Sequence, residues 1–161
     1  YHIRYGYCII YNVRMNEVIV EGSYKSRRIL AENVVNFCIK ELMPRMKTLY
    51  IEVSLISLKG QDAVGWFVEG DNNREYHLEI EKTLTEEEFI ETLAHEMVHV
   101  YQGSTLKIKD KASKRFWKCK DGKYRNYSDV DYAKQPWEVE AYRMEGPLSK
   151  KYKEINYGVA L

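Results

Sequence analysis

The strongest constraint on the fold is the segment from Thr85 to Tyr101, which has the pattern of an amphipathic helix. Thr85 and Glu88 have the spacing of a capping box, in which each side chain bonds the other residue's backbone amide. Acidic residues fill the first turn, where the helix dipole favours them. Apolar side chains then recur at intervals of three and four residues. The pattern predicts a helix over residues 85–101 that ends at Gly103.

Helical and strand patterns precede this segment. Apolar spacing predicts a helix over Ser26–Met43, with Pro44 as its stop. Three stretches rich in β-branched and aromatic residues follow and predict the strands of an antiparallel or mixed sheet, namely Thr48–Leu58, Ala63–Val68 and Arg74–Thr83. The opening residues 2–20 permit a short strand or an irregular entry.

Two further patterns follow the central helix. Residues 107–125 carry nine Lys and Arg against two Asp, and Asp121-Gly122 predicts a two-residue hairpin turn within them. Pro136 opens a helical stretch, Trp137–Glu145, which Gly146-Pro147 is expected to close. Strands followed by helices indicate the α+β class. At 161 residues, the economical expectation is one domain over 1–161.

Composition excludes several classes of protein. With 45% hydrophobic and 30% charged residues, the chain is too apolar to be mainly disordered. A net charge of +1 creates no global attraction to nucleic acid or an anionic membrane. Three widely spaced cysteines cannot form a complete disulfide framework, which favours a reducing compartment. No apolar run is long enough to span a membrane, so we expect a cytoplasmic protein with no membrane partner.

The candidate chemistry lies inside the central helix, in the pentad His95-Glu96-Met97-Val98-His99. Residues four apart lie one turn above each other, so both imidazoles can reach one ion. Glu96 is rotated by about 100° and can address a water molecule bound to that ion. Helix phase places both histidines away from the apolar stripe, toward solvent or a cleft. The pattern is typical of half of a zinc hydrolase site.

Such a zinc site needs a third protein ligand and keeps one position for water. Glu138 and Glu140 lie on the second predicted helix and are the leading candidates. Glu138 falls near the third helical position, where it can cap the backbone. Glu140 projects from the helix body, so it is the predicted ligand. Glu88 and Glu91 share the stripe of the histidines but also suit ordinary surface charges.

The pentad, followed about forty residues later by Glu138-Val139-Glu140-Ala141-Tyr142-Arg143, resembles the small gluzincin metallopeptidases. The likeness is to ImmA/IrrE-like and SprT-like proteins, many of them phage-encoded. It implies a zincin-like fold with an HExxH active-site helix and a second, ligand-bearing helix. It also implies zinc on His95, His99 and Glu140, with Glu96 as general base. No histidine follows His99, and neither Asp nor Asn follows Ala141, so the family within the clan stays open.

This resemblance implies a zinc-dependent metallohydrolase, and specifically a peptidase acting on peptides or proteins. Glu96 would accept a proton from the metal-activated water and pass it to the leaving amine. Tyr142, beside the predicted ligand, is the candidate oxyanion donor. His77 lies on the polar side of its predicted strand, and the resemblance places that strand along the substrate cleft.

A binding module is the alternative function. The segment Lys107–Arg125 interleaves its basic residues with Phe116, Trp117 and Tyr124, which could follow phosphates and stack on bases. In that case the histidines, with or without a metal, would hold a site that engages nucleic acid or a protein partner. The acidic stretch Glu75–Glu91 could equally compensate this basic segment within the fold.

Overall fold

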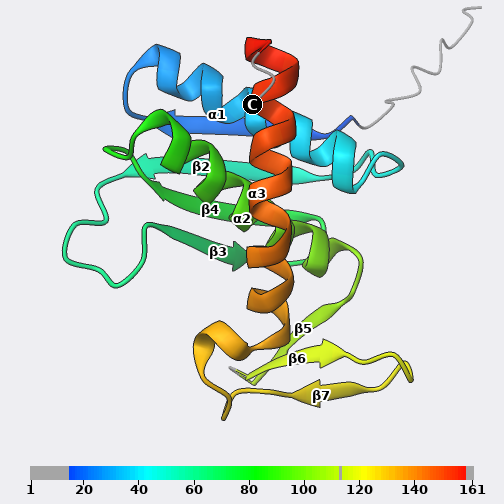
Figure 1. The fold of residues 1–161 in the computed structure, drawn as a ribbon. Coiled ribbons are helices and arrows are strands. Elements are labelled where there is room, and N and C mark those ends of the chain that lie inside the picture. Colours follow the sequence, from blue (N-terminus) through cyan, green and yellow to red (C-terminus); the bar gives the residue numbers. More distant parts are fainter. Residues whose placement is uncertain (1–14, 113, 159–161) are drawn as a thin grey trace, which may run out of the picture.

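The computed structural model describes residues 15–112 and 114–158, in which three α-helices and two β-sheets form an α+β architecture (Figure 1). Residues 2–14 of the expected opening segment lie outside the described part of the chain. Among the described residues, no helix is both long and apolar enough to cross a membrane.

The larger sheet has four strands in the order β1-β2-β4-β3. Their bounds are Glu17–Gly22 for β1, Tyr50–Ile56 for β2, Gly65–Glu69 for β3 and Glu75–Glu81 for β4. β1 and β4 both run parallel to β2, whereas β3 runs antiparallel to β4. The sheet is therefore mixed. Helix α1, Lys25–Leu42, connects β1 to β2 and makes their parallel pairing possible.

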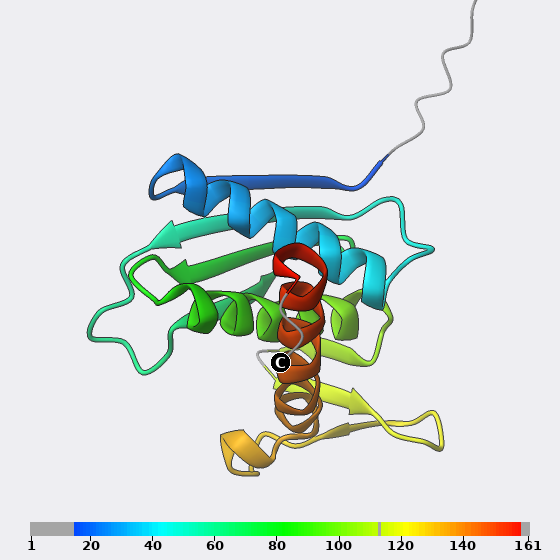
Figure 2. The same cartoon turned by 45° about the horizontal axis from the view of Figure 1, so that its top comes forward.

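The core lies between the sheet and α1, α2 (Glu86–Ser104) and α3 (Pro136–Tyr157). On β2 and β4 the buried side chains alternate with more exposed ones, so the helices cover one face of this sheet. α1 and α2 pack side by side, and α3 crosses α2 from the small sheet toward α1 (Figures 1 and 2).

The start of α2 confirms the predicted capping box. The Thr85 hydroxyl accepts from the Glu88 amide at 3.3 Å, and the Glu88 carboxylate accepts from the Thr85 amide at 3.0 Å. The predicted end at Gly103 is wrong, because α2 continues to Ser104. A Cβ at Gly103 would lie 2.9 Å from the Tyr76 hydroxyl oxygen. This glycine is needed for close packing rather than for a helix stop.

Helix α3 corrects the expectation that Gly146-Pro147 closes the second helix. It runs without a break from Pro136 to Tyr157, with Pro147 inside it. A proline removes one hydrogen bond and normally breaks a helix. Here the following turns are held by packing, since Leu148 and Tyr152 are buried and the Tyr152 ring lies 5.4 Å from that of Phe37. Tertiary burial thus outweighs the local stop signal.

The basic segment forms a second, three-stranded antiparallel sheet of β5 (Ile108–Lys111), β6 (Lys114–Lys118) and β7 (Tyr124–Asn126). The predicted hairpin at Asp121-Gly122 is confirmed between β6 and β7, with Gly122 at φ +78°. The expected two-residue loop is wrong, because Cys119 pairs with Lys123 and the loop has three residues, 120–122. β5 was not predicted. A short 3-10 helix, Tyr132–Lys134, then leads into α3.

Candidate metal centre

The two histidines of the pentad lie one turn apart on α2, with their Nε2 atoms 3.2 Å apart. Both are buried beneath α3, and the His99 ring also lies 5.7 Å from the Phe67 ring of β3. Only 8% of His95 and 3% of His99 is exposed. Of the two expected surroundings, solvent or a cleft, the structure gives His95 a place on the wall of a cavity and leaves neither ring open to solvent.

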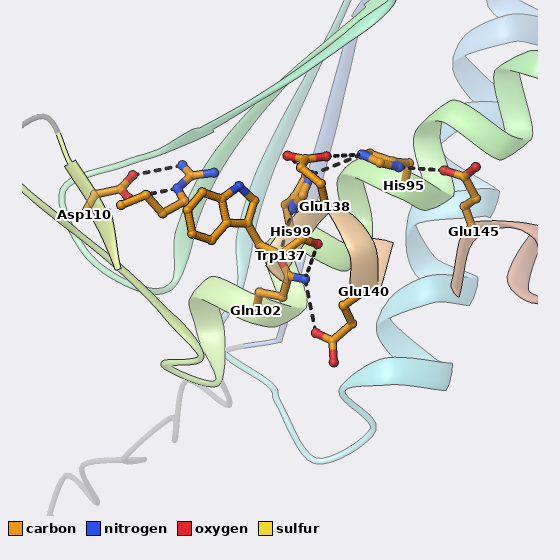
Figure 3. Close-up of polar contacts among 9 residues, drawn as sticks. His95, His99, Gln102, Asp110, Trp137, Glu138, Glu140 and Glu145 are labelled. Atoms are coloured by element: carbon orange, nitrogen blue, oxygen red, sulfur yellow. Dashed lines mark hydrogen bonds and ion pairs between the residues drawn. The ribbon is translucent and has the colours of Figure 1, made fainter. Parts of the chain in front are cut away.

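The carboxylate that α3 brings to these rings belongs to Glu138. Its Oε2 lies 3.2 Å from Nε2 of His95, and its Oε1 lies 3.4 Å from Nε2 of His99 (Figure 3). Ligand atoms about 2.0–2.1 Å from a tetrahedral zinc are separated by about 3.3–3.4 Å. His95, His99 and Glu138 thus form a buried triad that could hold a metal ion.

Glu140, the predicted third ligand, does not reach the histidines. Its carboxylate accepts a hydrogen bond from Gln102 at 3.1 Å (Figure 3) and another from Lys107 at 2.7 Å. The capping role assigned to Glu138 is also wrong, because α3 has no side-chain cap. Positions 138 and 140 differ by about 200° around a helix, so only one of them can face the histidines.

The sequence contains a signal that Glu138, rather than Glu140, faces the histidines. Glu138, Ala141 and Glu145 have the i, i+3, i+7 spacing of one helix face. The small, fully buried Ala141 lets α3 approach α2. The two glutamates on either side of it both reach His95. When the helix face formed by these three residues is considered as a whole, it favours Glu138 as the glutamate that reaches the histidines.

The outer nitrogen of each imidazole is bonded to an acceptor. Nδ1 of His95 lies 2.6 Å from Oε2 of Glu145, and Nδ1 of His99 lies 2.9 Å from Oε1 of Gln102. Both partner atoms accept but cannot donate, so Nδ1 carries the proton in each ring. The Nε2 atom of His95 also lies 3.2 Å from a carboxylate oxygen, Oε2 of Glu138, and this contact is a hydrogen bond when that nitrogen carries a proton. A metal ion bound at the Nε2 atoms would displace this proton.

The protonation of this cluster shows how strongly it attracts positive charge. Burial by itself lowers the pKa of His95, but hydrogen bonds to Glu138 and Glu145 outweigh it and raise the pKa to about 9. Burial by itself raises the pKa of Glu138, but hydrogen bonds from His95 and His99 bring it down to about 2. The glutamate is therefore a carboxylate at neutral pH and can serve as an anionic ligand.

Glu96 borders a cavity of about 580 Å³, which His95 also lines. Burial raises the pKa of the Glu96 carboxyl, which suits a group that accepts a proton near neutral pH. Gly65 of β3 forms the opposite wall, where a Cβ would lie 2.7 Å from Oε1 of Glu96. The Glu96 carboxylate is therefore held between α2 and the backbone of β3.

Tyr142, the predicted oxyanion donor, also lines this cavity, and its ring centroid lies 4.9 Å from that of His95. The structure adds Tyr132, which reaches the same cavity from the 3-10 helix. Burial of its hydroxyl and the nearby Glu138 carboxylate raise the pKa of Tyr132, so the hydroxyl keeps its proton. Among fourteen tyrosines, nothing in the local sequence distinguishes this one.

His77 lies away from the cluster, and its expected place beside the substrate cleft is wrong. It shares a register row with Glu52 and Val68 on the sheet face opposite to the buried Tyr76 and Leu78. Its nearest charged partners are Glu52 at 3.7 Å and Glu79 at 3.8 Å. β4 is paired on both sides, so it offers no edge to a peptide. Among the described strands the edges of this sheet are β1 and β3, and β3 is the one that borders the cavity.

The basic segment supplies several of its charges to internal ion pairs. Lys107 pairs with Glu140, and Arg115 and Arg125 pair with the aspartates of the same segment. These three pairs leave six of the nine cations for an external partner. Binding of nucleic acid stays a prediction, now based on fewer cations. Glu88 and Glu91 line the cavity but lie outside the triad.

Taken together, the described residues form an α+β protein with a buried His–His–Glu cluster beside a cavity. In comparisons with known proteins, no family model, no curated protein and no solved structure matches the chain. Arguments about the function therefore depend on the geometry of this centre.

Proposed function

We propose that this protein is a zinc-dependent peptidase in which His95, His99 and Glu138 hold the metal and Glu96 is the general base. The observation that carries the proposal is the convergence of the Glu138 carboxylate on two buried imidazole nitrogens. The Nε2 atoms of His95 and His99 lie 3.2 Å apart, and the two carboxylate oxygens lie 3.2 Å from the first and 3.4 Å from the second. Both histidines also have their outer nitrogens bonded to acceptors, the arrangement that orients imidazoles toward a metal.

The remaining parts of a hydrolytic site surround this cluster. Bound zinc would supply Lewis-acid polarisation of a carbonyl and acidify a water molecule. Glu96, next to His95 in sequence and on the cavity wall, would accept the proton of that water and return it to the leaving amine. Tyr132 and Tyr142 both offer protonated hydroxyls to a developing oxyanion.

The fold supports a zincin-like assignment. The HExxH helix packs beneath a mixed sheet, and the edge strand β3 runs antiparallel to its neighbour along the cavity. An extended peptide can add to the free edge of such a strand through backbone hydrogen bonds. The gluzincin resemblance supports a third ligand from the later helix, with the register moved from Glu140 to Glu138.

The cavity also indicates which peptides fit. Its lining includes five carboxylates and no lysine or arginine, together with aromatic residues; the carboxylates are Asp62, Glu88, Glu91, Glu96 and Glu145, and the aromatic residues are Trp66, Tyr132 and Tyr142. Acidic and aromatic walls favour a cationic side chain through charge and cation–π contacts. We therefore expect peptides with lysine or arginine near the scissile bond to be preferred.

The test combines metal analysis with turnover. Protein purified without added zinc is expected to hold close to one equivalent, and to cleave members of a fluorogenic peptide library until a chelator removes the metal. Glu96→Gln should keep the metal and lose hydrolysis, because an amide cannot accept the proton. Hydrolysis that survives chelation, or that persists in Glu96→Gln, would contradict the assignment. Less than about a tenth of an equivalent, unchanged by His95→Ala, would favour the binding module.

A further inference from the structure

A chain of polar contacts leads away from His99 on the side opposite to the triad. From the imidazole it passes to Gln102 and then to Glu140 (Figure 3). It ends at Lys107, at the start of the basic segment. We propose that Gln102 is a positioning residue, held by Glu140 and Lys107, that fixes the tautomer of His99 and so aims Nε2 at the metal. This inference rests on the proposed zinc site.

The orientation of the Gln102 amide follows from its partners. The side chain is fully buried, and its nitrogen lies 2.9 Å from the backbone carbonyl oxygen of Trp137. A carbonyl only accepts, so the NH2 group of Gln102 must point there. Its oxygen then faces Nδ1 of His99 and can only accept, which places the imidazole proton on Nδ1. With the amide reversed, two oxygens would face each other at 2.9 Å in a buried site.

Glu140 satisfies the second hydrogen of this amide. Its Oε2 accepts from Gln102 at 3.1 Å, while Oε1 accepts from Lys107 at 2.7 Å. Lys107 itself lies over the ring of Tyr101, with Nζ 4.6 Å from the centroid. Glu140 therefore holds Gln102, and Lys107 holds Glu140 and balances the charge of its carboxylate. This network also explains why α3 carries a second glutamate two residues after the ligand.

The two histidines are thus oriented by different chemistry. His95 donates to the carboxylate of Glu145, whereas His99 donates to a neutral amide. A glutamate at position 102 would still accept from His99. However, it would oppose the Trp137 carbonyl and the Glu140 carboxylate with a negative charge. The charge of Glu140 is tolerated because Lys107 neutralises it outside the ligand layer.

The test measures zinc affinity and the His99 tautomer separately. Gln102→Leu keeps most of the volume and should weaken zinc binding by about 10–100-fold, the effect typical of losing an outer partner of a ligating histidine. Gln102→Glu should fail to restore it. Glu140→Ala, at the periphery of the network, should weaken binding in the same direction. Lys107→Met tests the end of the network, and Lys109→Met is its matched control, expected to bind zinc as the parent does.

Imidazole ¹⁵N NMR of the ion-free protein reports the tautomer directly and does not depend on metal. The parent should show a protonated Nδ1 on His99, and Gln102→Leu or Glu140→Ala should shift the ring toward a mixture of tautomers. Unchanged zinc affinity and an unchanged tautomer in folded Glu140→Ala and Gln102→Leu would overturn the inference. If Gln102→Leu does not fold, Glu140→Ala decides. A parent that binds no zinc while the tautomer shifts as expected would refute the zinc site but retain the positioning role.

Discussion

Replacing Glu138 by glutamine gives the sharpest test of the proposed ligand set. Glu138 is 2% exposed, and its two carboxylate oxygens lie 3.2 Å and 3.4 Å from the Nε2 atoms of His95 and His99. The amide keeps the size and removes the charge. Zinc in small structural sites binds with about 10–16 kcal/mol, or about 3–5 kcal/mol for each of three or four ligands. Loss of one ligand should therefore weaken binding by roughly 10²–10⁴-fold.

The assay is competition for Zn²⁺ with a chromophoric chelator at fixed pH, with circular dichroism to confirm that each variant is folded. Glu154→Gln is the matched control, since Glu154 lies on α3 but is exposed, and it should bind zinc like the parent. Glu140→Gln should weaken binding by no more than about 10–100-fold. If Glu140→Gln strips the metal while Glu138→Gln binds zinc normally, the register deduced for α3 is wrong.

Four other predictions follow from the same geometry. Glu96→Gln should abolish turnover while zinc stays bound, as metal analysis beside a peptide assay will show. Gly65→Ala should lower kcat strongly with little loss of zinc, because the new methyl group occupies the space of the Glu96 carboxylate. Glu91→Lys should shift preference away from basic peptides, measured as the ratio of kcat/KM for matched lysine and glutamate substrates. In ion-free protein, the ionised Glu138 carboxylate stabilises the fold fully at pH values above the ordinary glutamate pKa of 4.5, and this stabilisation is lost as the pH falls to the depressed pKa of about 2. Protonated His95 stabilises the fold fully below the ordinary histidine pKa of 6.5, and this stabilisation is lost as the pH rises to the raised pKa of about 9. Unfolding free energy should therefore peak between these pH values and fall by about 3 kcal/mol at either extreme, counted once for the shared pair; a flat profile in urea titrations would contradict this.

Local sequence was sufficient to predict the central helix and the relative position of the two histidines on it. A capping box is formed within four consecutive residues, so the Thr85–Glu88 start could be predicted without knowledge of the fold. The stacking of His95 over His99 likewise depends only on helix geometry, which repeats every 3.6 residues. The Asp121-Gly122 turn is confirmed for the same reason, because its backbone conformation is set by the residues inside it.

Features that depend on how one helix meets another required the tertiary structure. Glu138 and Glu140 are the same residue type in the same helix, so the sequence pattern hardly distinguishes them. The rotation of α3 about its axis decides which of the two reaches the histidines. Burial of Ala141 against α2 sets that rotation, and it places Glu138 at the histidines and Glu140 at Gln102. Continuation of α3 through Pro147 has the same origin, since packing of Tyr152 on α1 compensates for a stop signal that acts only locally. The sequence by itself determined which residues can bind a metal, and interhelical packing decided which of them meet.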